Sequence, residues 1–339
     1  MNRFIAFMRC SSCRFAAFYF LSFYIALLDT GNGEWYWVIF SAFFWLLHST
    51  GTELTNRLSD QVEDRINRKE RTFLCDKVGF SLIQKLSIII WSIIIIVDIV
   101  WLLRYPNPNL AVLLILGLLA GINYSYGMRF KTKRYLSLFA LTFPFGGPFL
   151  IGWSVYNPLP AAAENLTALV YRGGPVIFLI GIFIASLAGV KDITDVSGDE
   201  RVGYQSLWVS LVRQHATKII ICIVTAPFLC LLLMLYTQVL PLRFAGLLIF
   251  MPVSLILAFC VSVARENEHQ QALRELFYHY WFVFLSSALF LYVFTEAAFW
   301  TIFGTSCYWI FTSQYLHWSS GIRLWKLKVV TSLIRQYKF

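Results

Sequence analysis

A succession of apolar runs, each close to the length of a membrane-spanning helix, constrains this chain more than any other feature. About 20 apolar residues cross the hydrocarbon core as an α-helix, and lipid-exposed backbone is tolerated only in helices and closed barrels. Composition agrees, since 58% of the 339 residues are hydrophobic and 14% are charged. The sequence therefore predicts an all-α polytopic membrane protein with about nine transmembrane helices. The runs fall near residues 14–29, 36–54, 81–103, 109–127, 135–155, 174–191, 217–236, 241–264 and 280–303.

The net charge of +10 is distributed as in a membrane protein. The basic residues lie in short loops between apolar runs, so positive-inside topology and anionic membrane lipid explain them better than a nucleic-acid partner does. With the N-terminus inside, the charged loops face the cytoplasm. They contain Arg65, Arg68, Lys69, Arg71 and Lys77, then Arg129, Lys131, Lys133 and Arg134, then Arg201, Arg213 and Lys218.

The C-terminal segment, residues 304–339, does not fit nine crossings, because its basic residues would then lie outside. Two explanations stay open from the sequence. Arg323, Lys326 and Lys328 alternate with apolar residues, which favours an interfacial helix. Alternatively, residues 300–311 re-enter the bilayer.

Two rows of oxygen-bearing side chains occur where an apolar run meets a polar loop. Within each row the spacing returns to the same side of an α-helix. Carboxylates near lipid cost about 2.5–3.5 kcal/mol each at mid-bilayer, so such rows call for a cation or a polar cavity. The rows are Asn56, Asp60 and Asp64 in the first, and Asp192, Asp195 and Asp199 in the second.

This donor set is typical of magnesium bound together with a phosphorylated substrate. Mg²⁺ takes carboxylate and phosphate oxygens and neutralises charge on a departing diphosphate. Arg129 and Lys131, in the segment Y-S-Y-G-M-R-F-K, are placed to assist. For a membrane protein the indicated substrate is an isoprenoid diphosphate, whose apolar tail lies between helices.

The two rows resemble the signatures of the UbiA superfamily of intramembrane prenyltransferases. The first, N-x-x-x-D-x-x-x-D followed by D-R-I-N-R-K-E-R-T, is similar to the first signature. The second, K-D-I-T-D-V-S-G-D, is closer still, and Tyr124 to Lys131 resembles the family's tyrosine-to-lysine segment. The resemblance covers residues 1–303 and implies a domain of nine helices around a central cavity open to the cytoplasmic side and to lipid. Lys69 departs from the family, which commonly has proline there.

The resemblance also implies roles for individual residues. Asp192 would orient or deprotonate the acceptor, while Arg129 and Lys131 act on the diphosphate. Tyr124, Arg68 and Arg71 would contribute to substrate binding. The implied ligands of Mg²⁺ are Asn56, Asp60, Asp64, Asp195 and Asp199.

Three functions remain open from the sequence. The first is magnesium-dependent prenyl transfer from a prenyl diphosphate to a lipophilic, aromatic acceptor. The second is terpene cyclisation, in which the carbocation is captured by its own double bonds. The third is a membrane transporter or scaffold, although acids clustered at one membrane edge are atypical of a midplane ion pathway.

Two further features of the sequence are an acid–base pair and the set of cysteines. Glu53 and Arg57 are four residues apart, which predicts an ion pair on the helix surface rather than a catalytic role. The seven cysteines are an odd number, so no disulfide framework is indicated. Cys10 and Cys13 form an isolated C-x-x-C without the further ligands that a zinc site requires.

Overall fold

The computed structural model describes residues 2–133, 136–157, 169–194, 211, 217–319 and 325–336. Within these ranges the chain is helical, and it divides into two compact units. Unit 1 contains Met1–Lys131, Phe143–Val170 and Val293–Gly321; unit 2 contains Thr132–Thr142, Tyr171–Tyr292 and Ile322–Phe339.

Helices of unit 1 begin and end at residues suited to these places. The side chain of Asn107 accepts hydrogen bonds from the first turn of α7, and Pro108 follows where no amide donor is needed. Gly79 ends α5 with φ 92°, a conformation that favours glycine. The helices are α1 (Arg3–Cys10), α2 (Ala16–Asp29), α3 (Trp35–Ser59), α4 (Gln61–Asn67), α5 (Lys69–Val78), α6 (Phe80–Arg104), α7 (Pro108–Asn123) and α16 (Glu296–Tyr315), with short 3₁₀ turns at Cys13–Phe15 and Phe130–Thr132.

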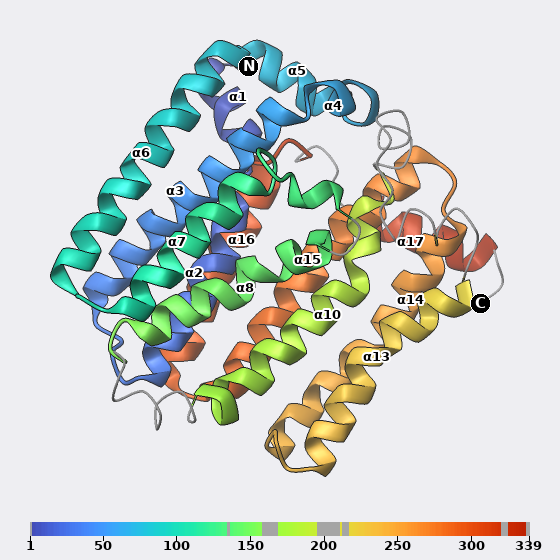
Figure 1. The fold of residues 1–339 in the computed structure, drawn as a ribbon. Coiled ribbons are helices and arrows are strands. Elements are labelled where there is room, and N and C mark those ends of the chain that lie inside the picture. Colours follow the sequence, from blue (N-terminus) through green and yellow to red (C-terminus); the bar gives the residue numbers. More distant parts are fainter. Residues whose placement is uncertain are drawn as a thin grey trace. The chain divides into compact units, whose positions relative to one another are not determined.

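The core of unit 1 is aromatic. In Figure 1, α2, α3 and α6 lie side by side, and α16 packs against α2. Trp37, Phe44 and Trp101 are almost fully buried where α3 meets α6, with the Phe44 and Trp101 ring centroids 5.4 Å apart. Burying large rings here holds the N-terminal half of α3 against α6. The first acidic row begins at the opposite end of α3.

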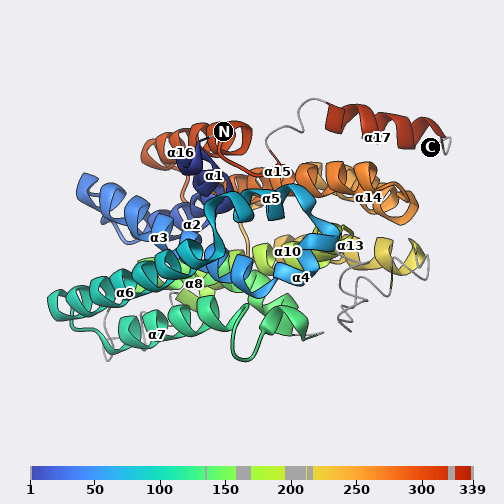
Figure 2. The same cartoon turned by 90° about the horizontal axis from the view of Figure 1, so that it is seen from above.

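Unit 2 is built around α10 (Gly174–Asp192), which packs against α13 (Thr217–Tyr236) and α15 (Asn267–Tyr292). A 3₁₀ segment, Leu242–Ile249, leads into α14 (Phe250–Val263), and a π-helical turn, Leu169–Gly173, precedes α10. The helix α17 (Trp325–Gln336) packs against α15 and α14, as the view in Figure 2 also shows. The remaining helix, α8 (Leu136–Ser154), has residues in both units.

Four helical stretches among the described residues are long and apolar enough to cross a membrane: Phe80–Arg104, Tyr171–Val190, Thr217–Tyr236 and Leu242–Val263. A pair bent by 45°, Arg3–Cys10 with Cys13–Asp29, counts as a fifth if it forms one span. The structure confirms an all-helical protein with apolar spans, and the number nine stays a prediction.

The prediction that residues 280–303 form one membrane span is wrong. This run joins the end of α15 to the start of α16, and the chain breaks between Tyr292 and Glu296. Thr295 caps α16 by accepting a hydrogen bond from the Ala298 amide at 3.2 Å. Averaged hydropathy hides this break, because apolar residues flank the short polar segment Thr295–Glu296 on both sides.

Candidate functional site

The first acidic row lies at the end of α3, but it does not continue along one straight helix. The helix ends at Ser59, and Asp60, with φ −103° and ψ 20°, separates it from α4. The prediction that Asn56, Asp60 and Asp64 lie on one face of a single helix is therefore wrong, because Asp64 lies on α4. The backbone still links the row, since the Asp60 amide donates to the Asn56 carbonyl at 3.0 Å and the Asp64 amide donates to the Asp60 carbonyl at 2.8 Å.

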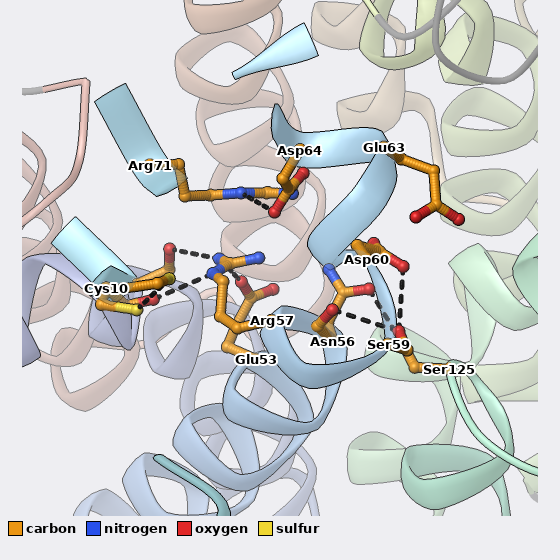
Figure 3. Close-up of polar contacts among 12 residues, drawn as sticks. Cys10, Glu53, Asn56, Arg57, Ser59, Asp60, Glu63, Asp64, Arg71 and Ser125 are labelled. Atoms are coloured by element: carbon orange, nitrogen blue, oxygen red, sulfur yellow. Dashed lines mark hydrogen bonds and ion pairs between the residues drawn. The ribbon is translucent and has the colours of Figure 1, made fainter. Parts of the chain in front are cut away.

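Asn56 and Asp60 share one cation, the ammonium group of Lys131. Its Nζ donates to Asn56 Oδ1 at 2.8 Å and to Ser59 Oγ at 3.0 Å, and it also forms an ion pair with the Asp60 carboxylate. Ser125 donates to the same Asn56 oxygen at 2.9 Å. Figure 3 shows Asn56, Ser59, Asp60 and Ser125 facing one another at the end of α3. The first row thus forms an oxygen-lined site that holds a positive charge.

A tight loop after α7 brings Lys131 to this site. Gly127 has φ 60°, and a Cβ there would lie 2.5 Å from the Asn123 side-chain oxygen, so the turn requires glycine. Arg129 also has a positive φ of 48°. The Lys131 amide donates to the Tyr124 carbonyl at 3.3 Å, which closes the loop. Tyr124 therefore positions Lys131 through its backbone.

The Lys131 and Asp60 side chains are only 13% and 14% exposed, so solvent screens the attraction between their charges only weakly. Burial opposes ionisation of Asp60, but the charge and hydrogen bond of Lys131 outweigh it and lower the pKa of Asp60. Burial lowers the pKa of Lys131 to about 8, although Asp60 favours its charged form. Each charge is thus stabilised in the buried site by the other.

Asp64 is bound by Arg71 instead of Lys131. The Arg71 Nε donates to Asp64 Oδ2 at 2.6 Å, and its Nη2 pairs with Oδ1. Both side chains are buried, at 2% and 8% exposure. Figure 3 shows the two groups facing one another. This bidentate pair ties α5 to the segment that carries the acidic row.

The predicted pair of Glu53 and Arg57 is confirmed as an i,i+4 ion pair. Arg57 is fully buried, which a helix-surface pair did not lead us to expect. Its Nε donates to the Cys10 carbonyl at 3.1 Å and its Nη2 to Ser12 Oγ at 3.1 Å. The pair therefore attaches the chain before α2 to the end of α3.

Several residues at this site were not predicted. Ser59 and Ser125 add hydroxyl groups to it, and Glu63 lies 3.4 Å from the Arg129 guanidinium. Glu63 belongs to the same acidic segment as Asp60 and Asp64, and a search for every acid in that segment would have found it. The serines carry no spacing signal, since serine is common at helix ends.

The other predicted residues are less fully described. Arg68 is buried between α4 and α5, and Asp192 is the last residue of α10. Asp195 and Asp199 lie outside the residues that the structure describes. No cluster of three or more His, Cys, Asp or Glu side chains that could hold a metal occurs in the described part of the chain.

The amide, hydroxyl and carboxylate oxygens of Asn56, Ser59 and Asp60 fit a hard divalent cation such as Mg²⁺. They already surround a positive charge at the end of α3, and the Asp64–Arg71 pair follows on α4 and α5. A carboxylate has about four lone-pair sites, so Asp64 can accept more contacts than the two from Arg71. The site therefore has the chemistry to bind a cation together with an anionic ligand.

The chain matches one family model and is similar to two solved structures. The model of the UbiA prenyltransferase family matches residues 16–282. Among solved structures, the chain is similar to a UbiA homolog from Archaeoglobus fulgidus bound to GPP and Mg²⁺, with 12% identity, a TM-score of 0.49, and 86% of this chain and 100% of that chain covered. The same homolog bound to DMAPP and Mg²⁺ gives 12% identity, a TM-score of 0.46, and coverage of 84% and 97%. No curated protein matches the chain significantly.

Proposed function

Because the chain belongs to the UbiA prenyltransferase family, we propose that it transfers a prenyl group from a prenyl diphosphate to a lipophilic, aromatic acceptor in the membrane, with Mg²⁺ as cofactor. The observation that carries the proposal is the cation site formed by Asn56, Ser59 and Asp60 around Lys131. The long apolar helix α6, which packs against α3, suits a substrate with an isoprenoid tail.

In this proposal, Asn56, Asp60 and Asp64 would hold one Mg²⁺, and Asp195 and Asp199 would hold a second. Bound Mg²⁺ neutralises the negative charge that develops on the diphosphate as its carbon–oxygen bond breaks. The sequence resemblance supports the assignment of the second row, and the donor chemistry at the end of α3 supports the first.

Lys131 changes partners when substrate binds. Its ammonium group releases Asn56 and Asp60 and binds a diphosphate oxygen, so a positive charge remains opposite the leaving group throughout. Arg129 and Glu63 lie 3.4 Å apart, and Arg129 is 38% exposed, so its guanidinium has room to turn to the same anion. Arg71 keeps Asp64 oriented.

The prenyl carbon then bonds to the acceptor, and diphosphate leaves with the electron pair of the broken bond. The acceptor loses one proton, which Asp192 accepts. The active site lies on the cytoplasmic side, as the distribution of basic loops supports.

The test is product analysis with the purified chain, Mg²⁺ and a panel of prenyl diphosphates, with and without phenols and quinone precursors. We expect a prenylated acceptor from the parent chain and loss of turnover in Asp60→Ala. Asp76→Ala is the matched control, because Asp76 is a half-exposed carboxylate on α5 that pairs with Arg65 at 3.4 Å.

Full activity of Asp60→Ala would overturn the assignment of the site. Hydrocarbon products formed without any acceptor would instead assign terpene cyclisation. Ion flux through liposomes in the absence of prenyl diphosphate would favour a transporter.

A further inference from the structure

Two cysteine thiols from distant parts of the sequence meet beside the acidic row. Cys10 ends α1 and Cys75 lies on α5, yet their sulfur atoms are 3.1 Å apart and hydrogen bonded. Both residues are buried, at 0% and 2% exposure. A disulfide needs a sulfur–sulfur distance near 2.05 Å, so closure requires a movement of about 1 Å.

The structure selects this pair over the C-x-x-C motif. Cys13 is three residues from Cys10, but it is buried and its carbonyl accepts a hydrogen bond from Tyr308 at 2.7 Å. All seven cysteines lie among the described residues, and Cys10 and Cys75 are the pair whose sulfurs are in contact.

The surroundings favour reaction at Cys10. Cys75 is hydrogen bonded to the Cys10 sulfur, and the positive charges of Arg57 and Arg71 act on Cys10, so its ionised form has favourable partners. The thiolate is the form of cysteine that reacts with oxidants. Cys10 is therefore the sulfur that reacts with the oxidant, and Cys75 is the sulfur that then forms the disulfide with it.

The two cysteines also lie at a mechanical junction. Arg57, next to Asn56 in the sequence, donates to the Cys10 carbonyl at 3.1 Å (Figure 3). Arg71, one helical turn before Cys75, holds the Asp64 carboxylate. A bond between the sulfurs would join α1 covalently to the helix that anchors the acidic row.

We propose that Cys10 and Cys75 form a reversible redox modification site that crosslinks α1 to α5 on exposure to a hydroperoxide. The peroxide oxygen is transferred to the Cys10 sulfur, giving a sulfenic acid. The Cys75 sulfur then attacks that sulfur, and water leaves. Two thiols are oxidised to one disulfide, and one molecule of hydrogen peroxide is reduced to two molecules of water. Hydrogen peroxide is neutral and little larger than water, so it suits a buried site.

The crosslink does not depend on the proposed prenyl transfer. It closes a loop between residues 65 positions apart, which restricts the unfolded chain and raises the unfolding midpoint. Arg3 already attaches α1 to the end of α5 by donating to the Val78 carbonyl at 2.9 Å. The native packing therefore needs little rearrangement to accept the bond.

The test uses the purified full chain in detergent, treated with hydrogen peroxide, then denatured and alkylated with N-ethylmaleimide. Mass spectrometry of the parent chain should show five maleimide adducts in place of seven and one peptide pair linked through Cys10 and Cys75. Dithiothreitol should restore all seven adducts. This measurement needs no variant to fold.

Variants test the choice of partner. Cys75→Ser should abolish the linked peptide, while Cys13→Ser, the matched control from the C-x-x-C motif, should retain it. Seven adducts after peroxide, a Cys10–Cys13 link, or oxidation of Cys10 beyond the sulfenic acid without a link would each overturn the proposal. Such a failure would leave prenyl transfer, measured separately in the presence of reductant, unaffected.

Discussion

Replacing Arg71 by methionine should destabilise the fold strongly. Methionine keeps much of the side-chain volume but leaves the Asp64 carboxylate buried without its partner. Both side chains are less than a tenth exposed, so solvent screens little of the interaction. Removing one partner of such a pair costs about 3–5 kcal/mol, a factor of roughly 10² to 10⁴ in the unfolding equilibrium.

The assay is unfolding in mixed micelles of a mild detergent and increasing SDS, followed by tryptophan fluorescence. Arg65→Met is the matched control, because Arg65 and Asp76 form an exposed pair at 3.4 Å, with side chains 58% and 48% exposed. Its loss should change the free energy of unfolding by about 0–1 kcal/mol. The double variant Asp64→Leu/Arg71→Met should recover most of the loss, since no unpaired charge remains.

Equal free energies of unfolding for Arg71→Met and Arg65→Met would refute the reasoning. A double variant as unstable as Arg71→Met would show that packing, not the unpaired carboxylate, accounts for the effect.

Three further predictions concern packing and topology. A Cβ on Gly152 would lie 2.3 Å from the Phe23 carbonyl oxygen, so Gly152→Ala should destabilise by about 1–3 kcal/mol, whereas Gly117→Ala, with open space around it, should stabilise by about 1 kcal/mol in the same assay. Asp98 is 4% exposed in α6, and neither of its carboxylate oxygens has a hydrogen-bond partner among the described residues. Asp98→Leu should therefore raise the free energy of unfolding by about 1–3 kcal/mol. A lower free energy of unfolding would show that the carboxylate has a stabilising partner. If α15 and α16, which are not among the four apolar stretches named above, each cross the membrane, the nine predicted crossings become ten and Lys328 lies on the cytoplasmic side. Lys328→Cys should then be labelled by an impermeant maleimide from the cytoplasmic face, and labelling from the opposite face would show that α16 does not cross.

The sequence predicts the helices best where apolar residues extend for a full span. The expected run at 81–103 corresponds to α6, and that at 217–236 to α13. It fails at 280–303, because a two-residue polar break contributes little to a window of about 20 residues. The N-cap of Thr295 decides that boundary through one local hydrogen bond.

At the candidate site, contacts between neighbouring residues in the sequence could be predicted, and contacts between different helices could not. The spacing of Asn56 and Asp60 correctly indicates that their oxygens lie together, because i and i+4 share a helical face. The partner of Asp64 could not be predicted, since it depends on how α5 folds back over α4. The contact of Cys10 with Cys75 is likewise tertiary, and the C-x-x-C spacing points to the wrong neighbour.

The most direct test of the central claim is equilibrium binding of a radiolabelled prenyl diphosphate to the purified chain, with Mg²⁺ and with chelator. We predict binding that requires Mg²⁺ and falls at least tenfold in Asp60→Asn, while Asp76→Asn binds as the parent does. Binding that is equally tight in chelator, or unchanged by Asp60→Asn, would contradict the assignment of the cation site at the end of α3.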